Sequence, residues 1–323
     1  MKLFVTGAAG FIGSNYVRHV LNTTDDSVTV YDALTYAGNR ANLADLEADS
    51  RFSFVHGDIC DRVLVSESMA GHDAVVHFAA ESHVDRSILD PDVFVRTNCT
   101  GTNVMCDVAR QVGVEKFLHI STDEVYGSID EGSFVETDPL GPRSPYSAAK
   151  AGSDLIALSY RETFGLPVVV TRSSNQFGPY QFPEKLIPFF VTSLLSGERV
   201  PLYGDGLNVR DWLFVLDNCA AVDLVLRKGE VGEVYNIGAD NERTNREITD
   251  MLLAMLNKSE ADVDYVDDRL GHDRRYSVDS QKVRALGWTG PTRDFADTLD
   301  ETVQFYRENE AWWQPLRSRV KNR

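Results

Sequence analysis

The sequence predicts an α/β fold, a doubly wound parallel sheet with a smaller, partly interleaved C-terminal α/β domain. Short apolar runs alternate with longer amphipathic patterns through the first half of the chain, as in parallel sheets covered by helices on both faces. Glycines at 7, 10 and 13 lie between the first apolar run and the first helical pattern. After about residue 172, Gly, Pro, Asn and aromatic residues cluster, which indicates a change of domain.

Each element follows from its periodicity and from the residues that interrupt it. Strands are expected at 2–6, 27–32, 52–58, 73–80, 115–121 and 166–172. Helices are expected at 11–21, 91–112 and 146–164. We therefore expect residues 1–172 to form a nucleotide-binding domain and 173–323 mainly a substrate-binding domain, with a segment of about 205–240 returning to the first.

Composition excludes several classes of protein. The chain of 323 residues has a formal charge of -17, and a general nucleic-acid binder needs a basic face. No run of 18 apolar residues occurs, and glycines interrupt the N-terminal apolar run, so we expect neither a membrane span nor a secretory signal. The expected location is cytoplasmic. The four cysteines lack zinc-binding spacing, so we expect reduced thiols and no metal site.

The first β-α-β unit predicts a dinucleotide site of the Rossmann type. Gly7, Gly10 and Gly13 permit a tight turn and close approach of backbone to a pyrophosphate at a helix N-terminus. Asp32 ends the second strand, where an acid can accept hydrogen bonds from the adenosine ribose. A carboxylate there repels a 2'-phosphate, so the expected cofactor is NAD and not NADP. The alternative is an ordinary glycine-rich turn with a surface Asp.

Tyr146 and Lys150 have the i,i+4 spacing that places two side chains on one helix face. An ammonium close to a phenol favours the phenolate, so we expect Lys150 to lower the pKa of Tyr146 toward that of a useful base. Such a base can take the proton of a substrate hydroxyl while hydride leaves the same carbon for NAD. A surface aromatic residue beside a solvated lysine is the alternative, and it is common.

The stretch "STDEVYG" (121–127) follows a predicted strand and carries two adjacent acids. Ser121 and Glu124 have the spacing of a capping box, which is the purely structural interpretation. At the carboxyl edge of a doubly wound sheet, however, Thr122, Asp123 and Glu124 would face the nicotinamide. Two adjacent carboxyls tend to titrate apart, giving one acid and one base. Oxidation followed by elimination of water requires both groups, whereas a plain alcohol dehydrogenase requires neither.

The spacing GxxGxxG is that of the short-chain dehydrogenase/reductase superfamily, and the chain as a whole resembles the dTDP-glucose 4,6-dehydratases. The more specific matches are "AESHVDRS" (80–87), "STDEVYG" (121–127) and "PEKLIP" (183–188). The resemblance implies that Tyr146 is the base for the 4-hydroxyl, Asp123 the acid for the 6-hydroxyl and Glu124 the base at carbon 5. It also implies that hydride passes from carbon 4 to NAD and returns to carbon 6, giving dTDP-4-dehydro-6-deoxyglucose in deoxysugar biosynthesis.

The resemblance also implies two sets of binding residues. Those expected to bind NAD are Gly7, Gly10, Phe11, Ile12, Gly13, Asp32, Ala33, Leu34, Thr35, Gly38, Asp58, Ile59, Phe78, Ala79, Ala80, Ser82, Thr97, Ser121, Tyr146, Lys150 and Gln176. Those expected to bind the dTDP-glucose substrate are His83, Thr122, Asn175, Glu184, Lys185, Leu186, Pro201, Tyr203, Arg210, Asn245 and His272. Arg210 is the expected diphosphate partner through charge-assisted hydrogen bonds, although a surface arginine beside Asp211 would look the same.

Two positions depart from the family pattern. The chain has Asn175-Gln176-Phe177 where the family usually has Asn-Asn-Tyr, so a contact near the nicotinamide is expected to move. Ala33 stands where a lysine is common, which affects adenosine contacts. Alternative functions are a nucleotide-sugar 4-epimerase or UDP-glucuronate decarboxylase, neither of which needs Asp123 as a leaving-group acid, and a catalytically silent NAD-binding regulator.

A homodimer is expected from the resemblance. Related enzymes pair through a four-helix bundle, which here would come from the helices near 91–112 and 146–164. Apolar residues of these helices, such as Val104, Val108, Leu155 and Leu158, fit such an interface and fit a core equally well.

Overall fold

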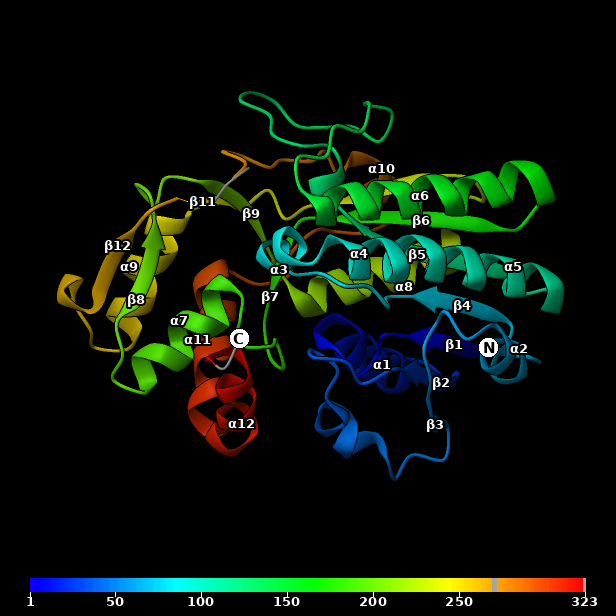
Figure 1. Ribbon diagram of the computed structural model, residues 1–323, viewed down its shortest axis with the longest axis horizontal. Coiled ribbons are helices and arrows are strands. Elements are labelled where there is room, and N and C mark those ends of the chain that lie inside the picture. Colours follow the sequence, from blue (N-terminus) through cyan, green and yellow to red (C-terminus); the bar gives the residue numbers. More distant parts are fainter. Residues whose placement is uncertain (269–271, 322–323) are drawn as a thin grey trace.

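The computed structural model describes residues 1–268 and 272–321. A seven-stranded sheet dominates the larger part of the molecule, on the right in Figure 1, with the order β10-β6-β5-β4-β1-β2-β3. All of its strand pairs are parallel. The strands are β1 (Lys2–Thr6), β2 (Ser27–Asp32), β3 (Phe52–His56), β4 (Ala74–His77), β5 (Lys116–Thr122), β6 (Val168–Ser173) and β10 (Val234–Ile237). The predicted doubly wound parallel sheet is therefore confirmed.

Alternation along the strands divides the apolar side chains between two cores. Leu3 and Val5 of β1 join a core with α1 (Phe11–Thr23) and α8 (Val215–Lys228). Phe4, between them, joins a core on the opposite face with α2 (Arg62–Met69), α5 (Thr102–Val112) and α6 (Pro145–Phe164). Successive side chains of a strand point to opposite faces, so a sheet covered on both faces needs apolar residues throughout.

The strand order reverses between β1 and β4, since β2 and β3 continue to one side and β5, β6 and β10 to the other. Loops that leave the carboxyl ends of strands at such a point separate and leave a crevice, which is where doubly wound folds bind ligands. The topology thus locates the site before any side chain is considered.

The expected helix at 91–112 is not uniform. It consists of α4 (Pro91–Phe94), a π-helical segment η2 (Val95–Gly101) and α5. Widened π turns are frequent at functional sites, and this one brings the Asn98 side chain to the Glu81 backbone. Asn98 accepts a hydrogen bond from the Glu81 N–H at 2.8 Å and donates one to its carbonyl at 3.0 Å. The segment therefore fixes the loop that follows β4.

The smaller part of the molecule has its own core. A three-stranded sheet has the order β11-β9-β7, and β8 pairs with β12. These strands are β7 (Asn175–Phe177), β8 (Val200–Tyr203), β9 (Val209–Phe214), β11 (Glu242–Thr244) and β12 (Val263–Val266). They pack with the helices α7 (Leu186–Leu195), α9 (Asn245–Met255), α11 (Phe295–Glu308) and α12 (Glu310–Lys321). Within 205–240, β10 belongs to the large sheet and α8 packs against that sheet. The strand β9 belongs to the small sheet.

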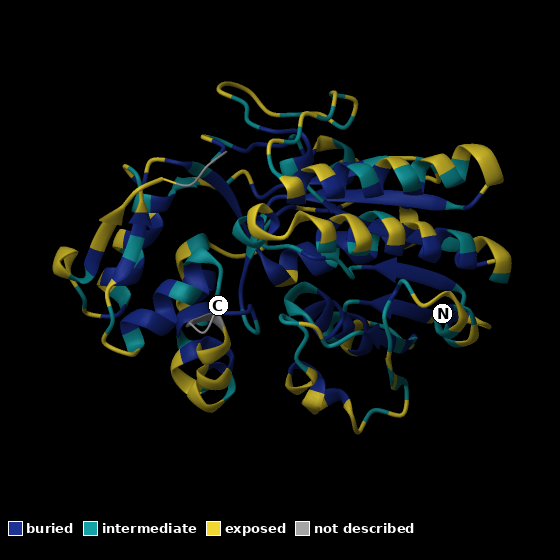
Figure 2. Cartoon of the chain, in the orientation of Figure 1, coloured by how far each residue is buried: buried dark blue, intermediate teal, exposed yellow. Residues whose placement is uncertain are grey.

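Several short elements complete the described chain. They are η1 (Arg40–Leu46), α3 (Val84–Leu89), η3 (Asp123–Val125), η4 (Glu260–Asp262) and α10 (Gln281–Ala285). Figure 2 shows buried strands between helices whose outer faces are exposed. Across the described residues, no helix is long and apolar enough to cross a membrane, and no group of three potential metal ligands gathers.

Most of the apolar residues considered for a dimer interface belong to the chain's own core. Val104 and Val108 are buried in the core beneath α5, and Leu158 packs against the same core. Leu155 is 61% exposed on α6. Periodicity cannot separate these cases because an interface helix and a core helix both carry apolar residues on one face.

Candidate active site

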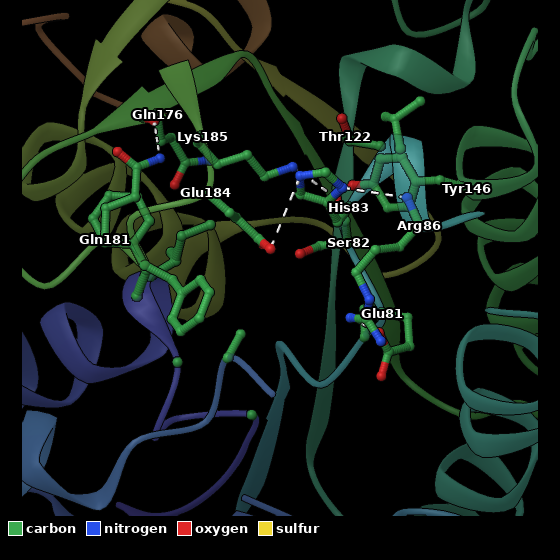
Figure 3. Close-up of a pocket in the computed structure, with 18 of the residues that line it drawn as sticks. Glu81, Ser82, His83, Arg86, Thr122, Tyr146, Gln176, Gln181, Glu184 and Lys185 are labelled. Carbon is green, nitrogen blue, oxygen red and sulfur yellow. Dashed lines mark hydrogen bonds and ion pairs between the residues drawn. The ribbon is translucent and has the colours of Figure 1, made fainter. Parts of the chain in front are cut away.

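A cavity of about 810 Å³ opens at the carboxyl ends of the parallel strands and extends to the smaller sheet. Every residue that the sequence predicts for catalysis, cofactor binding or substrate binding lines this cavity, with the exception of Leu34. Figure 3 shows how side chains from separate segments converge there, among them His83, Tyr146 and Glu184. Segments far apart in the sequence thus meet at one place, although lining a cavity does not assign a role to each residue.

Leu34 differs from its predicted placement. Its backbone lies in the left-handed region, with φ of 50°, and its side chain packs against the core beside α1. Its N–H donates a hydrogen bond to Asp32 Oδ1 at 2.8 Å. Leu34 therefore orients the carboxylate through its backbone, and its side chain does not belong to the cavity wall.

The glycine-rich turn approaches the end of β4 so closely that side chains are excluded. Gly7 has φ of 70°, and a Cβ there would lie 2.5 Å from the Ala79 nitrogen. A Cβ on Gly13 would lie 2.6 Å from the Ala8 Cα. Glycine is required at both positions, and the turn offers bare backbone at the start of α1, where N–H groups attract anions. These features fit a dinucleotide pyrophosphate.

Two acids that the sequence predicts for cofactor binding lie at the ends of neighbouring strands. Asp32 is the last residue of β2, and Asp58 follows β3. Asp32 is 7% exposed, and its Oδ2 accepts a hydrogen bond from the Ala9 N–H at 2.9 Å. Burial raises the pKa of Asp32, although the N–H groups of Leu34 and Ala9 oppose the rise. Asp58 instead pairs with Arg96 at 2.7 Å. Burial raises the Asp58 pKa, but the Cys60 N–H and Arg96 outweigh it, so that the net pKa is lowered.

The acid pair lies at the end of β5, as the sequence predicts. The local capping differs from the alternative that the sequence offered, because Thr122 is the N-cap of η3 and accepts from the Glu124 N–H at 3.2 Å. The Ser121 hydroxyl is buried and makes no hydrogen bond in the described structure. A capping box from Ser121 to Glu124 is therefore wrong. Ser121 and both acids line the cavity.

The surroundings of Asp123 favour its protonated form. It is 3% exposed; Oδ1 accepts from the Thr122 hydroxyl at 3.2 Å, and the buried Oδ2 has no protein partner in the described structure. Burial raises the pKa of Asp123 well above its usual value, and the neighbouring Glu124 and Asp211 carboxylates raise it further. A protonated carboxyl on a cavity wall can donate a proton to a leaving group.

Tyr146 and Lys150 share one face of α6, but their electrostatics differ from the prediction. Lys150 Nζ donates to the Ile120 carbonyl at 2.7 Å, and burial lowers the Lys150 pKa to about 8. Burial and the Glu124 carboxylate raise the pKa of Tyr146 well above its usual value, against a hydrogen bond with Thr122. The prediction that Lys150 lowers the pKa of Tyr146 is therefore wrong for the protein groups alone. Desolvation of the phenolate is the dominant effect, and it raises this pKa.

A polar network that the sequence did not predict joins three segments that line the cavity, and Figure 3 labels three of its members, Glu81, Arg86 and Glu184. The Tyr36 hydroxyl donates to Glu184 Oε1 at 3.1 Å. The Arg86 guanidinium lies 3.6 Å from the centre of the Tyr36 ring and pairs with Glu81 at 3.0 Å. Burial raises the pKa of Glu184. Arg86 and Glu81 lie in the same motif (80–87), whereas Tyr36 and Glu184 come from segments that are distant in the sequence.

The predicted diphosphate partner, Arg210, is 5% exposed and lies on β9. It donates to the Val209 carbonyl at 2.7 Å and to the Asp273 carbonyl at 2.9 Å, and stacks 4.3 Å from the Tyr276 ring centre. These carbonyls and the Tyr276 ring hold the guanidinium in place on the cavity wall. The alternative of an exposed surface arginine is wrong.

Other cavity residues complete the substrate end. His272 Nδ1 lies 2.6 Å from Asp268, and Lys185 donates to the Ser82 carbonyl at 2.9 Å. Gln181 and Trp212 were not predicted. Both are nearly buried and line the cavity, while Gln181 Oε1 and Trp212 Nε1 make no hydrogen bond in the described structure. No sequence motif distinguishes them from ordinary core residues.

Gln176, which departs from the family pattern, is anchored to α8. Its Oε1 accepts from Asn218 at 3.1 Å, and its Nε2 donates to the Ser174 carbonyl at 3.5 Å. The longer side chain therefore reaches a partner outside the cavity wall while still lining it. That a contact near the nicotinamide differs from the family pattern stays a prediction.

Comparisons with known proteins agree with this geometry. The family model described as GDP-mannose 4,6 dehydratase matches residues 4–302. The chain is 56% identical to a dTDP-glucose 4,6-dehydratase of Streptomyces antibioticus, over 99% of this chain and 96% of that protein.

Solved structures show the same similarity. The dTDP-glucose 4,6-dehydratase DesIV of Streptomyces venezuelae, solved with NAD and TYD bound, superposes with a TM-score of 0.96 at 55% identity, covering 98% of this chain and all of that one. A UDP-glucuronic acid 4-epimerase of Bacillus cereus superposes with a TM-score of 0.90 at 29% identity, covering 95% of this chain and 99% of that one. The fold alone thus does not separate a dehydratase from an epimerase.

NAD is expected to restore activity after cofactor removal, whereas NADP is not, because the Asp32 carboxylate would face its 2'-phosphate. The protein is stripped of nucleotide, each cofactor is added back over a concentration series, and activity and thermal stability are measured. Asp32→Asn should narrow the difference between the two cofactors. Equal rescue of the unaltered protein by NADP would contradict the assignment.

Proposed function

Because the chain belongs to the dTDP-glucose 4,6-dehydratases, we propose that it is an NAD-dependent hydro-lyase that converts dTDP-glucose to dTDP-4-dehydro-6-deoxyglucose. The relatives share the substrate named here, and deoxysugar biosynthesis is the process that uses the product. Local cations support an anionic substrate despite the overall charge of -17. Arg210 and Lys185 line the same cavity as the acid pair.

The smaller part of the molecule would bind the nucleotide sugar, and the large sheet would bind NAD. The exclusion of side chains at Gly7 and the buried carboxylate of Asp32 support the second assignment. The buried polar atoms Gln181 Oε1 and Trp212 Nε1 support the first, because they offer an acceptor and a donor on the cavity wall. A bound ligand would satisfy these atoms, which are costly when left without partners.

Each protein group then has a role in the reaction. Tyr146 takes the proton of the 4-hydroxyl, and Thr122 hydrogen-bonds the sugar. NAD, when bound, accepts the hydride from carbon 4 and returns it to carbon 6, and its positive ring opposes the rise in the Tyr146 pKa. The ketone at carbon 4 acidifies the hydrogen on carbon 5, which Glu124 removes as a proton, and carbon 5 is protonated again when hydride reaches carbon 6. Asp123 donates its proton to the departing 6-hydroxyl, so that water leaves.

The observation that carries the proposal is the burial of Asp123 beside Glu124. Burial and the Glu124 carboxylate raise the pKa of Asp123, so the pair would provide an acid and a base at one position. An epimerase returns hydride to carbon 4 and needs no leaving-group acid, and a decarboxylase loses carbon dioxide. A silent regulator would have no reason to keep Tyr146, Lys150 and the acid pair on one cavity.

A homodimer is part of the proposal, as is a cytoplasmic location. Apolar side chains remain exposed along the helices of the expected bundle, including Val95 at 54% and Leu155 at 61%. Removing such a patch from water would favour association. Val95 lies on η2 and Leu155 on α6, and these two helices contact each other.

An isotope experiment tests the reaction directly. With deuterium at carbon 4 of dTDP-glucose, the label should appear at carbon 6 of the same product molecule, and solvent deuterium should appear at carbon 5. The products are analysed by mass spectrometry and NMR. Label that returns only to carbon 4, with an inverted centre there, would establish an epimerase instead.

Substitutions in the site should stop the reaction at different stages. Tyr146→Phe should give no NADH absorbance on mixing with substrate, because the acceptor for the hydroxyl proton is gone. Glu124→Gln and Asp123→Asn should reduce bound NAD and then stall, with elimination slowed by about 10² to 10⁴. Stopped-flow absorbance and product analysis separate the steps. Normal accumulation of product by either acid variant would refute its role.

Leu155→Asp should weaken the dimer, because a charge placed in an apolar interface loses its hydration. Sedimentation velocity at micromolar concentrations should show a dimer for the unaltered protein and a shift toward monomer for the variant. Phe164→Asp, at the exposed end of α6, provides a second position. A monomeric unaltered protein would argue against the dimer.

A further inference from the structure

Behind the active site lies a fully buried charged network that the reaction scheme does not use. Asp154 of α6 is 0% exposed, and its Oδ2 lies 2.9 Å from Arg172 Nε. Its Oδ1 lies 3.2 Å from Nε2 of His119, on β5. Arg172, on β6, is 4% exposed. Charges buried this deeply are costly unless they are paired, so such a network needs an explanation.

One end of the network reaches the redox pair. Tyr146, Lys150 and Asp154 recur at intervals of four residues, so they occupy one face of α6. Lys150 is anchored to the β5 backbone by its hydrogen bond to the Ile120 carbonyl. That carbonyl is neutral, and Asp154 is the buried carboxylate that favours the Lys150 ammonium most strongly. Asp154 therefore offsets the charge on which the redox step depends.

The other end reaches the acid pair. Arg172 donates from Nη1 to the Tyr126 hydroxyl at 2.7 Å and lies 4.8 Å from the centre of that ring. The Tyr126 hydroxyl donates in turn to Asn236 Oδ1 at 2.8 Å. Tyr126 is the residue directly after η3, and its N–H donates to the Asp123 carbonyl at 3.0 Å. The position of Tyr126 therefore constrains the turn that carries Asp123 and Glu124.

We propose that the Asp154–Arg172 pair positions both halves of the active site, Asp154 by stabilising the Lys150 ammonium and Arg172 by fixing Tyr126 and the acid-bearing turn. The inference rests on the proposed function, since it assigns separate steps to the two halves. Neither residue lines the cavity, so both are positioning residues and not catalytic ones.

The charge balance around Lys150 determines the direction of the expected pH effect. The titratable and charged groups that act on it directly or through Asp154 are Asp154 of α6, His77 of β4, Cys99 of η2, His119 of β5 and Arg172 of β6. Tyr146 lies on the same face of α6. Burial lowers the pKa of both histidines, so neither adds positive charge at neutral pH. Replacing the Asp154 carboxylate by a neutral amide leaves Lys150 and Arg172 without their shared anion. Lys150 should then lose its proton at a lower pH.

The first experiment measures the pH dependence of the redox step in the holoenzyme. Asp154→Asn should move the alkaline limb of NAD reduction by dTDP-glucose to lower pH by about one unit or more, the effect of an opposite charge nearby. Asp223→Asn is the matched control, since Asp223 pairs with Arg227 at 2.7 Å on α8, away from the redox pair. The control should lower thermal stability and leave the limb in place. An unchanged limb in a folded Asp154→Asn enzyme would overturn the inference.

The second experiment uses a milder change, which keeps the inference testable if Asp154→Asn does not fold. Tyr126→Phe removes the hydroxyl and keeps the ring, which stacks on the Phe134 ring with 5.0 Å between the ring centres. Reduction of NAD should stay within about twofold, whereas elimination should slow by about tenfold, because small displacements of catalytic groups are costly. Reduced cofactor should therefore accumulate. If both steps slow equally, or if neither step slows, the proposed role of Arg172 and Tyr126 is overturned.

The unaltered enzyme separates failure of the inference from failure of the proposed function. If it makes no 4-keto product from dTDP-glucose, both the function and the inference that rests on it are refuted. If it turns over normally and the variants show neither the pH shift nor the split between steps, the inference alone is refuted.

Discussion

The hydrogen bond between Lys150 and the Ile120 carbonyl, at 2.7 Å, is the contact on which the active site depends. It fixes the inner face of α6 against β5 at Ile120, three residues before η3 begins at Asp123. Because α6 also carries Tyr146, and β5 leads directly into Asp123 and Glu124, one contact fixes the redox groups relative to the acid and the base. β5 lies inside the sheet, between β4 and β6.

Burial acts on the three titrating groups in different directions. A medium of low polarity disfavours whichever form carries charge, so it raises the pKa of Asp123 and Tyr146 and lowers that of Lys150. For Asp123 the result suits an acid at neutral pH. The protein groups by themselves oppose ionisation of Tyr146. The charges of bound ligands must therefore stabilise its phenolate against the effect of burial. The site is thus arranged for chemistry that begins only when it is filled.

The scaffold itself does not determine the reaction. A 4-epimerase with 29% identity shares the architecture with a TM-score of 0.90. Function lies instead in a few side chains placed on that scaffold, above all the acid pair on η3. The polar network of Tyr36, Arg86 and Glu184 joins segments of both parts of the molecule, which shows how contacts between the two parts shape the cavity.

The sequence alone determined the features that depend on local periodicity. Strands at 2–6 and 27–32 have the predicted bounds, because alternating or continuous apolar residues between polar ends leave little choice of register. The glycine turn, the Tyr146–Lys150 pair and the acid pair were likewise visible as short motifs. Arg210 and His272 were predicted only through the family resemblance, since neither is distinctive in isolation.

Tertiary structure decided what depends on distances between separate segments. The π-helical turn in 91–112, the inward packing of Leu34 and the buried contacts of Asp154 with His119 and Arg172 follow from packing that no single segment encodes. The raised pKa of Tyr146 is the clearest example. Spacing placed Lys150 on the same helix face, but the balance between desolvation and nearby charge depends on how deeply the fold buries the phenol.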